Sequence, residues 1–199
     1  VLQLGKKIYV ANAGDSRSLI ATYNKSTSAV DIMYITREDK PDLPEERARV
    51  ESMGGRVYIP PPDGYGASSR VLFVDKNIDR MNGLAMSRSI GDWDAGKLGV
   101  IPDPTVAVLD ISDLINASAS SGHAGDVEVF AVSATDRLLD FVNTVEIATS
   151  VAHGLYTEEG PHLLSACESL ITIAATLWWK AKYGTYRDDI AIAVSKMSM

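Results

Sequence analysis

Short apolar stretches, each bounded by polar or glycine residues, recur along most of the chain and predict β-strands. They lie at residues 8–12, 18–23, 29–35, 70–74, 105–109, 127–132 and 190–194. β-Branched and aromatic residues dominate several of them, as is typical of strands. Gly14 and Asp15 stand between the first two stretches, a pair that favours a tight turn, so we expect these two strands to form a hairpin.

A different spacing, of three and four residues, predicts two helices late in the chain. The capping-box residues Asn143 and Glu146 mark the start of the first helix. Its apolar stripe comprises Phe141, Val145, Ala148, Ala152 and Leu155. The second helix is expected at residues 162–182, and its buried side comprises Leu163, Ala166, Leu170, Ala174, Leu177 and Trp178. Strands combined with such helices indicate a layered α+β protein.

A shorter helix is expected earlier in the chain, from Asp42 to about Met53. Asp42 and Glu45 have the spacing of a capping box, and two glycines that follow Met53 would end the helix. Residues 110–126 are polar and rich in small side chains, which predicts a long loop before the strand at 127–132.

Composition narrows the classes of partner. The 199 residues are 46% hydrophobic, enough for one domain with a core of its own. The net charge of −7 argues against a nucleic-acid partner, and no apolar run approaches the roughly 18 residues of a membrane span. With one cysteine, Cys167, and no signal-peptide pattern, we expect an intracellular protein, in the cytoplasm, the nucleus or both. Three histidines do not indicate a zinc site, and we interpret His162 and Cys167 as structural.

The strongest chemical signal is the segment at residues 133–140, which reads S-A-T-D-R-L-L-D. Asp136 and Asp140 follow directly on a predicted strand, and a turn into a helix would bring both carboxylates over one small volume. Oxygen ligands alone suit hard cations such as Mg²⁺ or Mn²⁺. The eight residues are equally consistent with an Asp136 that ends the strand and an Asp140 that caps a helix.

Five segments, in this order, resemble those of the PP2C-type (PPM) metal-dependent serine/threonine protein phosphatases. They read A-N-A-G-D-S-R at 11–17, E-R-A-R-V-E-S-M-G-G-R-V at 46–57, M-N-G-L-A-M-S-R-S-I-G-D at 81–92, S-A-T-D-R-L-L-D at 133–140 and D-D-I-A-I-A-V at 188–194. The resemblance makes residues 1–199 a partial domain, similar to the C-terminal part of the family's catalytic domain. It implies an α/β/β/α sandwich of two mainly antiparallel sheets flanked by helices, with the N-terminal part missing.

The resemblance also implies an activity and its ligands. Members of the family hydrolyse phosphoserine and phosphothreonine in protein substrates with a water activated by two or three Mg²⁺ or Mn²⁺ ions. By their place in the motifs, Asp136 and Asp188 correspond to metal ligands, and Asp15 and Asp140 to residues near a further, more weakly held ion. Two dications about 4 Å apart repel by roughly 4 kcal/mol even at the dielectric constant of water, so several carboxylates must surround them.

Three features depart from the family's pattern. The D-G-H-G-G segment, which carries further metal-site residues in the family, is absent from this sequence. Asp189 replaces an Asn, and Arg137 stands where the family has Gly after the metal-binding Asp. A cation beside two dications weakens metal binding unless its guanidinium points away, which is the orientation we expect. Alternatively, Arg137 binds the phosphate of the substrate.

Two functions therefore remain open. The first is a Mg²⁺- or Mn²⁺-dependent protein phosphatase whose N-terminal segment lies outside this sequence. The second is a non-catalytic PP2C-like pseudophosphatase that acts as a partner-binding module. The four aspartates favour the first, because a scaffold has no need for such a set, whereas Arg137, Asp189 and the missing N-terminal segment favour the second. We also expect the isolated chain to be unstable, because truncating a sheet exposes strand edges.

Overall fold

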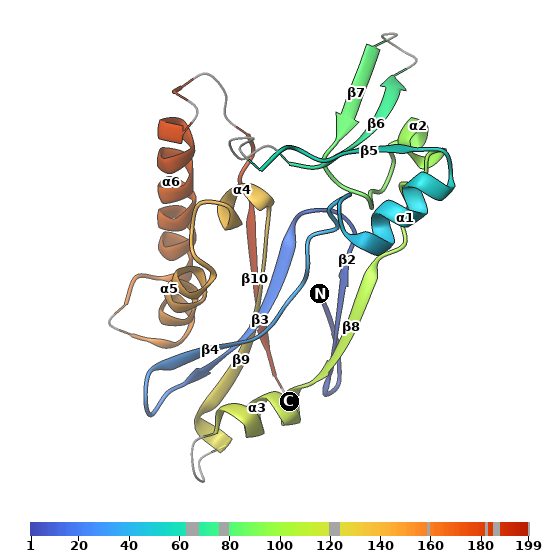
Figure 1. Cartoon of the computed structure of the whole chain (residues 1–199). Helices are drawn as coiled ribbons and strands as arrows, with labels where there is room; N and C mark the ends of the chain where they lie inside the picture. Colours follow the sequence, from blue (N-terminus) through green and yellow to red (C-terminus); the bar gives the residue numbers. More distant parts are fainter. Residues whose placement is uncertain are drawn as a thin grey trace. The chain divides into compact units, whose positions relative to one another are not determined.

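The computed structural model describes residues 1–62, 68–75, 80–119, 124–158, 160–181, 183–184 and 188–198 (Figure 1). The chain divides into two compact units, and each is described by itself. The core unit comprises Val1–Val10, Ser16–Thr36 and Val106–Met199. The inserted unit comprises Ala11–Asp15 and Arg37–Thr105.

Two sheets form the core unit. The four-stranded sheet has the order β10 (Ile192–Met197), β9 (Val127–Ala134), β3 (Arg17–Asn24) and β4 (Ala29–Ile35), and each neighbouring pair is antiparallel. The three-stranded sheet has the order β1 (Leu2–Leu4), β2 (Lys7–Asn12) and β8 (Thr105–Asp110). The strands predicted from apolar stretches are thus present, although the last one begins at Ile192, two residues later than expected.

The central strands β3 and β9 are buried along almost their whole length, because each face of the sheet supports its own apolar cluster. Phe130 and Val132 belong to one cluster, whereas Val129 and Ala131 belong to the other, as the two-residue period of a strand requires. The second cluster also contains Ile8 of β2, so the two sheets share a core.

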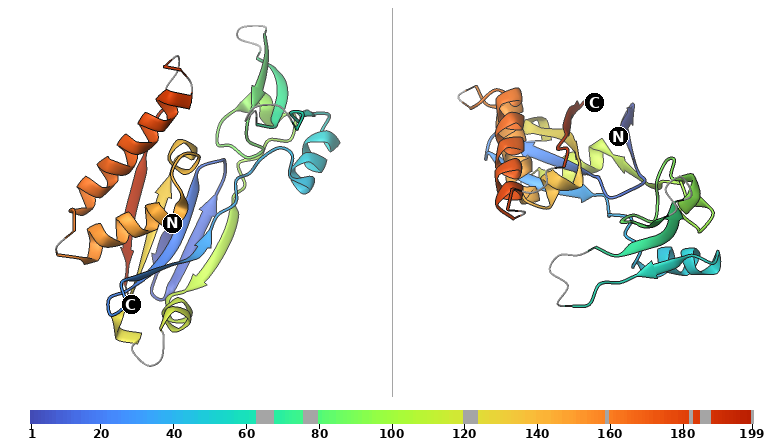
Figure 2. Two further views of the ribbon diagram at one scale, coloured as in Figure 1. Left: turned by 60° about the vertical axis from the view of Figure 1, so that its left-hand side comes forward. Right: turned by 90° about the horizontal axis from the view of Figure 1, so that it is seen from above.

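Helices α5 (Thr144–Tyr156) and α6 (Leu163–Ala181) lie along one face of the four-stranded sheet, and the short α4 (Asp136–Leu139) precedes them (Figure 2). Asn143 caps α5 as predicted, since its Oδ1 accepts a hydrogen bond from the backbone N–H of Val145 at 2.8 Å. The predicted apolar stripes are wrong in part: Val145 is 57% and Leu177 38% exposed, whereas Ile147 is buried. Because α5 packs against both α6 and the sheet, its buried face is displaced from the predicted stripe.

The segment predicted as a long loop at 110–126 contains helix α3 (Ile111–Ser118), which corrects that prediction, followed by a 3₁₀ turn (Ala124–Asp126). Asp110 caps α3, because its Oδ1 accepts a hydrogen bond from the backbone N–H of Ser112 at 2.8 Å. Ile111, Leu114 and Ile115 lie on one face and are buried in the second apolar cluster. Their spacing of three and one is that of a short amphipathic helix.

The predicted hairpin of the first two strands is wrong, because β2 and β3 belong to different sheets. β3 pairs instead with β4 and β9. Gly14, whose φ is +127°, lies between β2 and β3, so the backbone freedom of glycine serves a crossover between sheets rather than a hairpin turn. Apolar alternation identifies a strand but does not say which strand it pairs with.

The inserted unit contains α1 (Pro44–Ser52), an antiparallel sheet in the order β5 (Arg56–Tyr58), β6 (Arg70–Asp75) and β7 (Arg80–Leu84), and the short α2 (Trp93–Gly96). Its core is small and comprises Val50, Val71, Ala95 and Val100. Gly55 allows this core to close, because a Cβ there would lie 2.6 Å from both the Leu98 carbonyl oxygen and Val50 Cγ1.

The capping box predicted for α1 is wrong. The helix begins at Pro44, Leu43 occupies the N-cap position, and no side chain caps it. Asp42 instead accepts a hydrogen bond from Ser69 Oγ at 2.6 Å, so its carboxylate ties the helix start to the strand region that follows. Across the described residues, no helix combines the length and the apolar character that crossing a membrane requires.

Candidate functional site

The candidate site lies at the end of the four-stranded sheet where β9 stops and the chain returns into β10 (Figure 1). Thr135 and Ala191 join these two segments through two hydrogen bonds, each of 3.1 Å. The chain then turns at once into α4, and the backbone N–H of Asp140 donates to the carbonyl of Asp136 at 2.7 Å. This helical turn and the strand pairing bring Asp136, Asp140 and Asp188 to the same end of the sheet.

We call Asp136, Asp140 and Asp188 the carboxylate cluster, and it surrounds the guanidinium of Arg137. Arg137 Nε donates to Asp188 Oδ2 at 3.1 Å and lies 3.5 Å from Asp136 Oδ2. Arg137 Nη1 lies 3.3 Å from Asp140 Oδ2. The Arg137 side chain is 27% exposed, so the cluster is open to solvent on one side. The two aspartates predicted as principal metal ligands therefore meet at one point, and a guanidinium lies there.

The expected outward orientation of Arg137 is wrong. The guanidinium carbon lies 4.4 Å from the ring centroid of Trp178 in α6, and Trp178 is itself buried and in edge contact with Phe141. Burial disfavours the charged form of Arg137, but the hydrogen bond to Asp188 and the charges of the cluster outweigh it and raise the pKa of Arg137. An aromatic face and three carboxylates together hold this side chain inward.

Asp15, the remaining predicted ligand, lies in the inserted unit. Lys40 Nζ is 3.4 Å from Asp15 Oδ2 and 3.3 Å from Glu38 Oε2, so the lysine lies between these two carboxylates. The backbone N–H of Gly14 donates to the buried carboxylate of Asp39 at 3.1 Å, which fixes the turn before Asp15. The proposed role of Asp15 beside the carboxylate cluster stays a prediction.

Sequence reasoning missed a second charged group, which we call the Glu46 cluster. The Glu46 side chain is 0% exposed and accepts hydrogen bonds from Arg88 Nη2 at 2.6 Å, Arg49 Nη2 at 2.6 Å and Arg37 Nη2 at 3.2 Å. Ser87 Oγ donates a fourth at 2.6 Å. Burial alone would raise the pKa of Glu46, but the hydrogen bonds from Arg88 and Arg49 lower it to about 2. The sequence signal that could have pointed to this cluster is the presence of arginines in two of the motifs that resemble the family. No local pattern shows that these arginines pair with Glu46.

The ligand chemistry of the carboxylate cluster fits a hard divalent cation, because every side chain in it is a carboxylate. The spacing of the three carboxylates, however, does not fit a divalent cation in this arrangement. Within the ranges described, no three Asp, Glu, His or Cys side chains are placed to hold a metal ion. The Arg137 guanidinium occupies the space among these carboxylates, at 3.1 Å from Asp188 Oδ2 and 3.5 Å from Asp136 Oδ2, whereas a bound ion would need oxygens at about 2.0–2.6 Å. A metal ion at this position therefore requires Arg137 to move.

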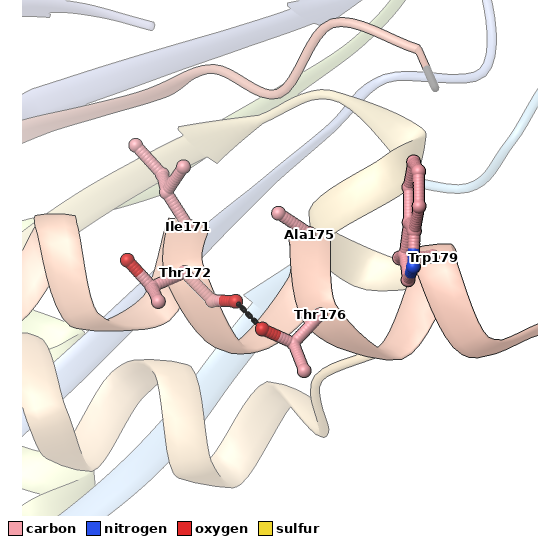
Figure 3. Close-up of a pocket in the computed structure, with 5 residues that line it drawn as sticks. All are labelled: Ile171, Thr172, Ala175, Thr176 and Trp179. Atoms are coloured by element: carbon pink, nitrogen blue, oxygen red, sulfur yellow. Dashed lines mark hydrogen bonds between the residues drawn. The ribbon is translucent and has the colours of Figure 1, made fainter. Parts of the chain in front are cut away.

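Two pockets elsewhere in the structure lack carboxylate side chains in their linings. One, of about 430 Å³, follows the outer side of α6 and is lined by Ile171, Thr172, Ala175, Thr176 and Trp179 (Figure 3). Its threonines are linked to one another through the helix backbone, because Thr176 Oγ1 donates to the Thr172 carbonyl at 2.8 Å. The other, of about 520 Å³, lies in the inserted unit beside the exposed Trp93. Neither is lined by a carboxylate, so the carboxylate cluster is the better candidate for a reaction centre.

Known proteins resemble this chain over nearly its whole length. A family model described as "Protein phosphatase 2C" matches residues 1–175. "Probable protein phosphatase 2C 12" of Oryza sativa subsp. japonica is 32% identical over 193 residues, which cover 97% of this chain and 43% of that protein. "Probable protein phosphatase 2C 73" of Arabidopsis thaliana is 29% identical over 192 residues, which cover 96% of this chain and 45% of that protein. The chain thus spans less than half the length of these relatives.

Solved structures resemble it as well. A serine-threonine phosphatase 2C from Toxoplasma gondii has a TM-score of 0.67 at 18% identity, covering 97% of this chain and 55% of that one. A C. elegans sex determining protein has a TM-score of 0.56 at 19% identity, covering 96% of this chain and 37% of that one. These likenesses confirm the predicted α+β fold. Since the family model covers most of the residues, the chain belongs to the protein phosphatase 2C family.

Proposed function

We propose that this chain is part of a protein phosphatase domain that hydrolyses phosphoserine and phosphothreonine in protein substrates with Mg²⁺ or Mn²⁺. One observation carries the proposal: Asp136 and Asp188, which are 52 residues apart in sequence, both lie within 3.5 Å of the same nitrogen of Arg137. The family membership and the names of the relatives support the same activity.

Each residue of the site has a proposed role. Asp136 and Asp188 are the principal metal ligands, and Asp140 serves a further ion. The role of Asp15 at such an ion rests on its place in the family motif alone. When bound, such ions supply an activated water and neutralise the phosphoryl oxygens. Arg137 is the candidate phosphate-binding residue, and its planar guanidinium suits two phosphate oxygens once it leaves the carboxylates.

The test is hydrolysis of a phosphothreonine peptide by the full-length protein that contains this chain, with Mn²⁺ varied. Asp136→Asn should lower metal-dependent kcat/KM by at least about 100-fold, because even residues that only support a metal ligand are worth about 10- to 100-fold. Asp113→Asn, at an exposed position of α3 in the same unit, is the matched control and should leave activity unchanged.

A second candidate function has a specific observation in its favour. Arg137 already neutralises part of the carboxylate cluster, as expected of a non-catalytic PP2C-like module that binds partners without a metal. The assay above separates the two candidates. If the folded wild-type protein shows no metal-dependent turnover at any Mn²⁺ concentration, the phosphatase proposal is wrong and the partner-binding module stands.

A further inference from the structure

We propose that Arg137 is a built-in cation of the carboxylate cluster that competes with divalent metal, so that Arg137 and Trp178 together set the metal concentration at which the site fills. This inference rests on the proposed function, because it takes the cluster to be the metal site. It concerns regulation of that site by the chain's own side chains.

The contacts of the guanidinium show why metal and arginine exclude one another. Arg137 Nε is shared by Asp136 and Asp188, and Nη1 contacts Asp140. A Mg²⁺ ion that bridges carboxylates needs oxygens at about 2.0–2.1 Å and keeps water on its other positions. Such an ion would stand where the guanidinium now lies. Since its charge is twice that of a monovalent cation, the ion would also repel the arginine twice as strongly as another arginine would.

The charges of the cluster favour replacement of Arg137 by a metal ion over permanent occupation of the site by Arg137. Three carboxylates face this one guanidinium. A divalent ion neutralises more of the carboxylates' charge than Arg137 does. The partial exposure of Arg137 gives the side chain a route to solvent, so it can leave when a metal ion arrives.

Trp178 determines how firmly the arginine is held. The indole is 4% exposed, lies 4.4 Å from the Arg137 guanidinium carbon and is fixed by an edge contact with Phe141 at 5.3 Å between ring centroids. A guanidinium above an indole face is stabilised by the negative charge of that face, an attraction that is strongest for tryptophan. Trp178 is thus a positioning residue, which acts on the metal site through Arg137.

The experiment measures Mn²⁺ binding to the full-length protein by electron paramagnetic resonance of the free ion, without any substrate. Arg137→Gln should bind Mn²⁺ at least about 10-fold more tightly than wild type. Adding Asp136→Asn to the Arg137→Gln protein should abolish this increase. Trp178→Phe should give a smaller increase, because phenylalanine holds a cation less strongly. Lys6→Gln removes one positive charge at an exposed turn of the same unit and should leave the affinity unchanged.

A second measurement covers the case in which Arg137→Gln folds poorly. Arg137→Lys keeps the charge but loses the planar fork and part of the stacking, so it should bind Mn²⁺ with an intermediate affinity. Equal Mn²⁺ affinity in wild type, Arg137→Lys and Arg137→Gln would overturn the inference, as would an Arg137→Gln protein that binds no Mn²⁺ through Asp136. Tighter Mn²⁺ binding by Arg137→Gln without any phosphatase activity would support the inference and contradict only the proposed function.

Discussion

The two charged clusters of this chain are built in opposite ways. In the Glu46 cluster of the inserted unit, one fully buried carboxylate accepts hydrogen bonds from three arginines. In the carboxylate cluster of the core unit, one partly exposed arginine faces three carboxylates, of which Asp136 is 20% and Asp140 40% exposed. In the first cluster arginines enclose a carboxylate, and two of them also lie near the buried Asp39, whereas in the second cluster carboxylates enclose an arginine.

This difference separates a structural cluster from one that can bind an added ion. A buried carboxylate is tolerated only if its lone pairs are satisfied, and Glu46 has donors on both oxygens. Removing one arginine would leave this fully buried carboxylate with fewer donors and no water in their place. The carboxylate cluster keeps contact with solvent, and its one guanidinium faces three carboxylates, so another cation has access to several oxygen ligands there.

The largest effect is expected at Glu46. Glu46→Gln should lower the free energy of unfolding by about 3–5 kcal/mol, because it removes the fully buried charge on which Arg37, Arg49 and Arg88 converge. Urea unfolding of the full-length protein measures this change. Glu51→Gln is the control on the same helix, since Glu51 forms an exposed pair with Arg47 and should cost about 0.5 kcal/mol or less. A loss at Glu46 no larger than that at Glu51 would contradict the structural role of the cluster.

Acid should weaken the Glu46 cluster in a defined range of pH. The folded-state pKa of Glu46 is about 2 and its ordinary value is 4.5, so folding favours the ionised form. The stabilisation from Glu46 is therefore fully present above pH 4.5 and is lost as the pH falls through about 2. At about 1.4 kcal/mol per pKa unit, it amounts to roughly 3 kcal/mol at most.

Unfolding curves recorded between pH 2 and pH 7 test this expectation. Wild type should lose stability over the acid range more steeply than Glu46→Gln, so that the two curves converge towards low pH. Glu51→Gln should follow the wild-type slope, because its carboxylate is exposed. Parallel curves for wild type and Glu46→Gln would mean that the Glu46 carboxylate does not gain its hydrogen bonds on folding.

The two clusters also show how far sequence reasoning reached. Only the resemblance to the phosphatase family implies that Asp136 and Asp188 share one site, and the pairing of β9 with β10 brings both to the same end of the sheet. The direction of the Arg137 side chain was not predictable in the same way. This direction depends on Trp178, which is 41 residues away in the sequence. The sequence predicts the buried side of the helix that carries Trp178, but not which residues pack against that side.

The fold shows the same contrast: features set by neighbouring residues are predictable from the sequence, and features set by distant residues are not. The cap of α5 at Asn143 is local chemistry and was predicted correctly. β2 pairs with the preceding β1 and with the distant β8 rather than with β3, and Gly14 lies in a crossover between sheets where a hairpin was expected. Helix α3 is an intermediate case, because its apolar spacing was visible at Ile111, Leu114 and Ile115 but lay within a stretch of small polar residues.

The smallest effect is expected at Asp140, and it gives the sharpest contrast with Glu46. Asp140→Asn removes one of three carboxylates around a single arginine, so it relieves repulsion while it loses one partly exposed ion pair at 3.3 Å. Asp140 also stands at the C-terminal end of α4, where a negative charge is unfavourable to the helix dipole. The free energy of unfolding should therefore change by no more than about 0.5 kcal/mol in either direction. Urea unfolding in the presence of a chelator measures it, with Asp113→Asn as the control for an exposed aspartate in the same unit. A loss above about 1.5 kcal/mol would show that the carboxylate cluster is as tightly built as the Glu46 cluster, and the distinction between them would fail.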